Sequence, residues 1–191
     1  MKQNLIFLLS FFPIFLFSQR RSECRSAMDF IFSPDYFAPP QEEADADFTP
    51  LFAYRVGLNV SVFSSPVPYF VFRSGMRYVR YGYEVKPLFS NQTSREYKQF
   101  VEIPLVFRLY FSLNKLRSYI EAQSSLNMNT GKTVGIHFTA GGAVGLEYLI
   151  KKEIALYCQP TFRKPIYHTV DARSLNYHFS TGLELGVKYR Y

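Results

Sequence analysis

The chain has 191 residues, 48% of them hydrophobic and 19% charged, which fits one domain and excludes a disordered chain that lacks apolar surface to bury. Two cysteines exclude a disulfide scaffold and a cysteine-rich metal module, and three histidines leave little material for a histidine-based metal site. The net charge of +7 comes from single basic residues spread along apolar stretches, such as Arg55, Arg73 and Arg108, and this spacing argues against nucleic-acid binding.

The first residues have the pattern of a secretory signal peptide. Lys2 supplies a positive charge, residues 5–17 are almost all apolar, and Ser18 is a small residue at a plausible cleavage position. The apolar run is shorter than the ~20 residues of a membrane-spanning helix. Cys24 is separated from that run by polar residues, so it does not mark a lipoprotein. We therefore expect a signal peptide at residues 1–18, rather than a buried N-terminal helix, then a periplasmic tail at residues 19–27.

The rest of the chain alternates apolar and polar residues with period two, which is typical of β-strands. The clearest case is the last segment, where Leu183, Leu185 and Val187 lie on one face, and Glu184 and Lys188 on the other. The alternation predicts eight strands, at residues 28–37, 52–62, 69–85, 101–111, 118–128, 134–150, 154–163 and 175–191. The first of these has the weakest pattern.

The predicted connections also alternate in length. Short ones fall at residues 64–68, 112–117 and 151–153, longer ones at residues 38–50, 86–98 and 164–174, and the connection at residues 129–133 is intermediate. Short turns at one end and longer loops at the other are typical of an outer-membrane barrel with both termini in the periplasm. We therefore predict that residues 28–191 form an eight-stranded antiparallel up-and-down transmembrane β-barrel.

A lipocalin-like soluble barrel shares this alternation but turns the apolar face inward around a ligand. Side-chain volume favours the membrane barrel, because the apolar faces carry far more large side chains than an eight-stranded lumen can hold. The polar faces, rich in glycine, serine and charged residues, suit a narrow interior. Aromatic residues near the predicted strand ends fit interfacial girdles: Tyr69, Tyr119, Tyr148, Tyr177, Tyr189 and Tyr191.

Several short motifs resemble those of a known family. The chain end, Glu184-Leu185-Gly186-Val187-Lys188-Tyr189-Arg190-Tyr191, resembles the C-terminal assembly signal of outer-membrane proteins. Ser33-Pro34-Asp35-Tyr36, Val101-Glu102-Ile103-Pro104-Leu105 and Gln159-Pro160-Thr161-Phe162-Arg163 resemble strand motifs of the small outer-membrane β-barrel proteins of Bacteroidota, the PorT-like group. The resemblance covers about residues 28–191. It implies an integral outer-membrane barrel of largely unassigned role, with no catalytic motif.

The inward faces carry nearly equal numbers of acids and bases. The acids are Asp29, Asp35, Glu102, Glu121, Glu147 and Glu184, and the bases are Arg55, Arg73, Arg77, Arg108, Arg163, Lys188 and Arg190. Charges in a narrow interior must be paired, because an isolated buried charge costs several kcal/mol. A plug of salt bridges is therefore favoured over a charged conduction path, which stays open as the alternative.

Two histidines raise the alternative of a lipid-modifying enzyme. His137 and His178 both face inward by parity, and Ser180 and Glu184 share a face with His178. Outer-membrane acyl hydrolases and acyltransferases use a histidine with a serine and an acid, but they place these groups where they reach lipid. Hydrogen-bonded interior histidines are the commoner case, so we expect no catalytic residue.

The remaining candidates are weaker. His168, Asp171 and Arg173 share a loop that could bind a ligand. Thr130-Gly131-Lys132-Thr133 resembles the end of a phosphate-binding loop, but the motif requires a glycine at position 126, where this sequence has Leu126. Glu42, Glu43, Asp45 and Asp47 form an acidic run that a solvated loop explains better than a cation site. Cys158 is expected to face lipid, and spacing gives no support for a disulfide to Cys24. We expect no cofactor and no metal ligand.

The sequence thus predicts an outer-membrane protein with an anchoring or interaction role and a plugged lumen. A narrow channel is the first alternative, a lipid-modifying enzyme the second, and a soluble lipocalin-like barrel the most remote. Expected partners are outer-membrane lipids, the barrel-assembly machinery through the C-terminal strand, and an unidentified envelope protein, but no nucleic acid.

Overall fold

The described part of the chain is almost entirely β-structure. The computed structural model describes residues 26–39, 46–64, 69–87, 93–112, 114–130, 135–168 and 177–191. The strands are β1 (Ala27–Phe37), β2 (Ala46–Pro50), β3 (Ala53–Ser64), β4 (Phe70–Pro87), β5 (Ser94–Tyr110), β6 (Leu116–Asn129), β7 (Ile136–Leu149), β8 (Ile154–His168) and β9 (Ser180–Arg190). Within these ranges, no helix is long and apolar enough to cross a membrane.

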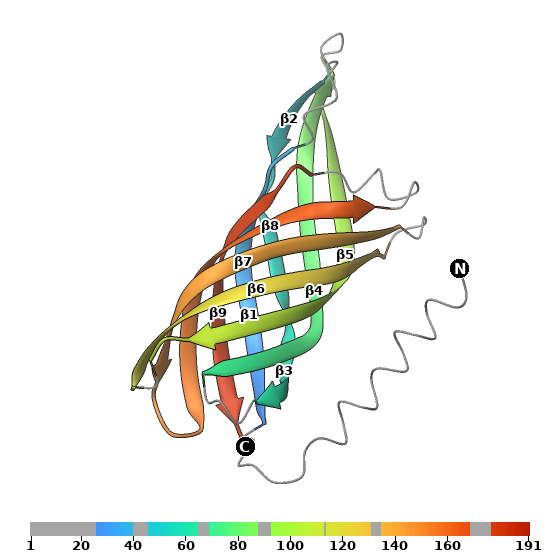
Figure 1. Ribbon diagram of the computed structural model, residues 1–191. Coiled ribbons are helices and arrows are strands. Elements are labelled where there is room, and N and C mark those ends of the chain that lie inside the picture. The colour runs from blue at the N-terminus through green and yellow to red at the C-terminus, as the bar shows by residue number, and fades with distance from the viewer. Residues whose placement is uncertain are drawn as a thin grey trace, which may run out of the picture.

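The strands close into an eight-stranded antiparallel barrel (Figure 1). Each neighbouring pair is antiparallel, and β9 returns to β1, with Tyr189 opposite Met28. β2 and β3 are successive parts of one wall strand, because β2 pairs with the upper part of β4 and β3 with the lower part. The predicted fold is therefore confirmed, including the first strand, whose sequence pattern was the weakest.

The two ends of the barrel differ in height. The end at which β1 begins and β9 ends is called the base here, and the opposite end the far end. Figure 1 shows β2, β4 and β5 rising beyond the other strands at the far end. The sequence placed the start of β5 at residue 101, but the strand begins at Ser94. The pattern missed residues 94–99 because they are mostly exposed and polar and show no alternation. This three-stranded extension, formed by β2, residues 82–87 of β4 and residues 94–99 of β5, is called the projection.

The outer wall of the barrel is apolar. Large hydrophobic side chains on every wall strand point away from the lumen and stay exposed, as at Phe30 (53%), Leu146 (54%) and Leu185 (44%). An exposed apolar belt on closed strands is the arrangement of a transmembrane barrel, in which lipid covers the belt. The soluble lipocalin-like alternative, which turns the apolar face inward, is therefore wrong.

Four of the six predicted girdle tyrosines lie on this outer surface, namely Tyr69, Tyr148, Tyr189 and Tyr191. Tyr119 and Tyr177 are instead buried inside the barrel, so their assignment to a girdle is wrong. Tyr119 shares the parity of the inward Glu121 on β6. Tyr177 precedes the start of β9 at Ser180, so the alternation of β9 does not extend back to it.

Candidate functional site

The lumen collects the charged side chains whose inward direction the sequence predicts. Twelve of the thirteen are buried, and the side chain of Arg190, at the base, is 15% exposed. These residues come from every described strand except β2, and they form connected ion pairs from the base toward the far end. This set is called the charged network. It fills the interior, so the predicted polar interior is confirmed.

Glu147 on β7 is the centre of the network at the base. Its carboxylate pairs with Lys188 and Arg190 of β9, at 2.5 Å each, and with Arg108 of β5 at 3.1 Å. The Tyr110 hydroxyl donates a further hydrogen bond to Glu147 at 2.6 Å. One carboxylate therefore ties together three strands that are far apart in the sequence.

Glu121 on β6 forms the middle of the network. It pairs with Arg108 at 2.5 Å and with Arg73, which also binds Asp29. The side-chain amide of Gln159 donates to Glu121 and to Glu184, at 2.9 Å each. Gln159 thus links the middle of the network to its upper part without adding a charge.

The upper part of the network is built in the same way around Glu102 and Glu184. Its ion pairs are Arg163–Glu184 at 3.1 Å, Arg77–Glu184 at 3.4 Å, Arg77–Glu102 at 3.6 Å, Arg55–Glu102 at 2.7 Å and Arg55–Asp35 at 2.7 Å. Each acid of the network therefore has at least one base, as burial of these charges requires.

Glycines make room for the largest side chains of this interior. The Tyr157 ring lies against Gly186 of the neighbouring strand, and Tyr119 lies against Gly145 in the same way. A Cβ atom at Gly186 would overlap the Tyr157 ring, and one at Gly145 would overlap the ring of Tyr119. Gly186 therefore faces inward, and a side chain there would crowd the lumen.

A second group of buried side chains lies at the far end of the lumen, where the sequence predicted no ring. Its aromatic members, which are called the aromatic cluster, are Phe37, Tyr81, Tyr83, Phe100 and Tyr177. Phe37 stacks on Tyr81, with ring centroids 4.4 Å apart, and packs edge-on against Tyr177 at 4.8 Å. The signal that could have revealed the cluster is parity, because Tyr81 follows Arg77 and Phe100 precedes Glu102 on the same inward faces.

The two inner histidines of the sequence hypothesis do not share a face. His137 is buried, as predicted, and packs edge-on against Phe100 with centroids 5.1 Å apart. His178 is exposed, so its predicted inward direction is wrong; it lies before β9, where its backbone N–H donates to Ala38. Ser180 and Glu184 are buried in the lumen. The structure therefore does not assemble His178 with Ser180 and Glu184.

The other candidates fall mostly outside the described residues. Asp171, Arg173, the acidic residues 42–45, most of the phosphate-loop imitation at residues 131–133, Cys24 and the signal peptide all lie there. His168 ends β8, Asp47 lies on β2, and Cys158 faces outward as predicted. Among the described residues, no three or more histidine, cysteine or acidic side chains are placed to hold a metal ion.

Comparison with known proteins agrees with this architecture. A family model described as an outer membrane protein beta-barrel domain matches residues 29–191. Neisserial surface protein A (NspA) is similar in structure, with a TM-score of 0.56 and 14% identity over 87% of this chain and 97% of that chain. No curated protein sequence matches the chain.

Two further solved structures are similar. A major outer membrane protein from Thermus thermophilus has a TM-score of 0.51 and 9% identity, over 89% of this chain and 100% of that chain. OprG from Pseudomonas aeruginosa has a TM-score of 0.50 and 8% identity, over 88% of this chain and 95% of that chain. At these identities the likeness concerns the fold alone.

Proposed function

The chain belongs to the outer membrane protein beta-barrel domain family, whose model spans residues 29–191, and we propose that this outer-membrane barrel is a non-catalytic anchor that presents a protein-binding sheet outside the membrane. Within the family, the motifs at residues 33–36, 101–105 and 159–163 support a place in the PorT-like group of Bacteroidota. The proposal includes cleavage of residues 1–18 and a base that faces the periplasm.

The closed lumen is the observation that carries this proposal. The charged network fills the part near the base, and the aromatic cluster fills the far end, so two layers of different chemistry lie across any path for solutes. A small barrel whose interior is filled by side chains has no room for an aqueous pore. A narrow channel is the alternative function, and conductance in planar bilayers separates the two.

The projection is the part of the barrel that supports an interaction role. β2 pairs only with β4 among the described strands, and residues 94–98 of β5 pair with β4 but not with β6. Both edges of this small sheet therefore carry backbone groups that pair with no other described strand, and such groups are templates for another chain. Tyr97 is 48% exposed there, with Arg80 stacked on its ring at 4.6 Å, and presents a large polar-tipped ring to a partner.

Site-specific photo-crosslinking in native outer membranes tests the interaction role. A photoreactive residue at Tyr97 should give a discrete protein adduct, whereas the same residue at the outward-facing Leu183 should not, because lipid covers that position. Absence of a discrete adduct from Tyr97, or the same adduct from both positions, would argue against the projection as a docking sheet.

We also propose that the last strand is read by the barrel-assembly machinery. Tyr189 and Tyr191 are exposed on the outer wall at the base, with ring centroids 6.3 Å apart, so they present a stacked pair of rings. Replacing both with alanine should deplete the protein from outer membranes in cells. Refolding of the purified double variant into detergent should stay nearly unchanged, because surface substitutions usually alter stability by about 0.5 kcal/mol or less. Normal membrane levels would leave only a girdle role.

A further inference from the structure

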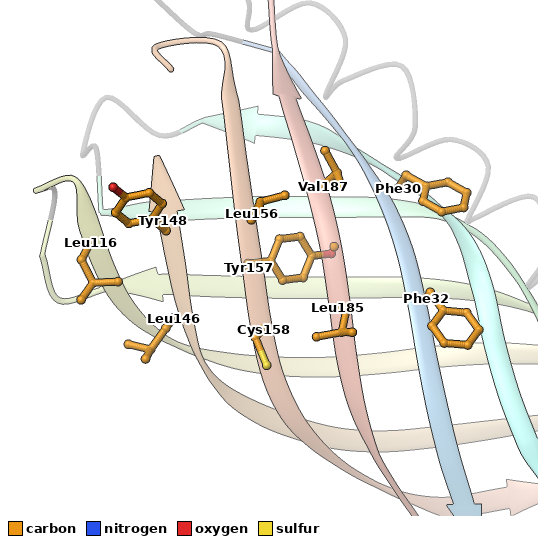
Figure 2. A pocket seen from close by; sticks show the side chains of 11 residues that line it. Phe30, Phe32, Leu116, Leu146, Tyr148, Leu156, Tyr157, Cys158, Leu185 and Val187 are labelled. Atoms are coloured by element: carbon orange, nitrogen blue, oxygen red, sulfur yellow. The ribbon is translucent and has the colours of Figure 1, made fainter. Parts of the chain in front are cut away.

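The outer wall near the base is hollowed by an apolar depression of about 580 Å³ (Figure 2). It crosses the wall from β6 to β1, and its lining includes Phe30, Leu116, Leu146, Leu156, Cys158 and Leu185. Figure 2 shows Phe30 and Phe32 on β1 at one side and Leu116 and Tyr148 at the other, with Leu156, Tyr157, Cys158, Leu185 and Val187 between them.

Cys158 has the smallest outward side chain among the residues that line this depression. Gly186 faces the lumen, as does the Tyr157 ring beside it, so neither contributes an outward side chain to the depression. Cys158, on the neighbouring strand, contributes only a thiol to the outer surface. A depression of this kind, with aromatic side chains at its edges, can bind a flexible apolar chain, whereas a smooth wall offers such a chain no preferred position.

Three lysines lie at the base edge of the depression. The Lys115 ammonium is 5.1 Å from the ring centroid of Tyr148, which lines the depression. Lys151 and Lys152 are exposed in the turn between β7 and β8. Lys115 lies in the connection between β5 and β6. This connection lies beside the end of β7, because the Lys115 carbonyl accepts a hydrogen bond from the backbone N–H of Leu149. Glu153 is the one acid in the β7–β8 turn, so positive charge is in excess at this edge.

We propose that this surface is a binding site for one anionic phospholipid of the leaflet that meets the base. The acyl chains lie in the depression, and the phosphate is held by Lys115, Lys151 and Lys152. Apolar area and basic side chains at the membrane surface each favour anionic lipid. The choice of leaflet rests on the proposed orientation, in which the base faces the periplasm. The site does not depend on the proposed partner of the projection.

Lipid binding to the purified barrel tests the site. Native mass spectrometry of detergent-solubilised protein, titrated with phosphatidylglycerol or phosphatidylcholine, should show about tenfold or more tighter binding of the anionic lipid. The triple variant Lys115→Gln, Lys151→Gln, Lys152→Gln should lose this preference. A matched triple variant at the other end, Lys86→Gln, Lys98→Gln, Lys164→Gln, should keep it.

A second pair of variants tests the depression itself. Cys158→Trp fills the depression and should weaken phosphatidylglycerol binding about tenfold, whereas Ala122→Trp, at another small outward position, should not. Heat-dependent mobility in gels checks that each variant is folded. Equal binding of the two lipids by the unmodified protein would overturn the proposal, as would an unchanged preference in the lysine triple variant or in Cys158→Trp. A dimer that Cys158→Trp abolishes and that phosphatidylglycerol does not affect would also overturn it, because the depression would then be a contact between copies.

Discussion

Two regions fill the same lumen by different means. The charged network, on the base side, consists of acids and bases whose positions are fixed by their partners, as in the four groups around the Glu147 carboxylate. The aromatic cluster, at the far end, consists of rings such as Phe37 and Tyr81 that need volume and edge contacts. The network depends on the identity of each charge, whereas the cluster depends on the total volume of apolar side chains.

The difference is sharpest when charge is removed without a change of shape. Glu147→Gln keeps the size of the side chain but leaves Arg108, Lys188 and Arg190 without their shared anion. Breaking a buried pair by removing one partner costs about 3–5 kcal/mol. We expect the free energy of unfolding in lipid vesicles to fall by about that amount, as measured by urea titration followed by circular dichroism.

The matched control for this change is Glu153→Gln, an exposed carboxylate in the adjoining turn. It should change the free energy of unfolding by about 0.5 kcal/mol or less. Equal effects of the two substitutions would contradict the claim that the network depends on specific buried pairs.

Adding a side chain to the filled lumen tests the packing around the charged network. Gly186→Ala should destabilise the barrel by about 1–3 kcal/mol, because the new methyl group overlaps the Tyr157 ring. In a Tyr157→Ala background the same substitution should cost much less. A double-mutant cycle by urea titration measures this coupling, and additive costs would contradict the contact between the ring and the glycine.

The aromatic cluster should tolerate a change of shape that keeps most of its volume. Phe100→Leu replaces one fully buried ring with a smaller apolar side chain, and such hydrophobic exchanges usually cost below about 1.5 kcal/mol. The same urea titration measures it. A loss as large as that of Glu147→Gln would show that the cluster is as specific as the network.

The sequence predicted the network better than it predicted the cluster. Period two placed Arg55, Glu121 and Glu184 in the lumen, because a charged side chain on the lipid face of a wall strand destabilises the barrel. A ring such as Tyr119 or Tyr177 is compatible with either face, so the same pattern did not distinguish a girdle from a filled lumen. Parity relative to the neighbouring charges would have resolved Tyr119.

Other predictions differ from the structure where the chain leaves the regular strands of the barrel wall. The bend before Ser180 breaks the alternation, so His178 and Tyr177 lie opposite to their predicted directions. The projection went unnoticed because its residues have no buried face to impose a pattern. The depression on the outer wall combines outward side chains of β6, β7, β8, β9 and β1, which strand register brings together.

Single-channel recording in planar bilayers tests the closed lumen most directly. Purified, folded protein, identified by its heat-dependent mobility in gels, is inserted beside a reconstituted porin as a positive control. With the charged network and the aromatic cluster both in place, we predict no sustained discrete openings under conditions in which the porin conducts. Sustained openings of nanosiemens size would contradict the closed lumen and favour the channel function instead.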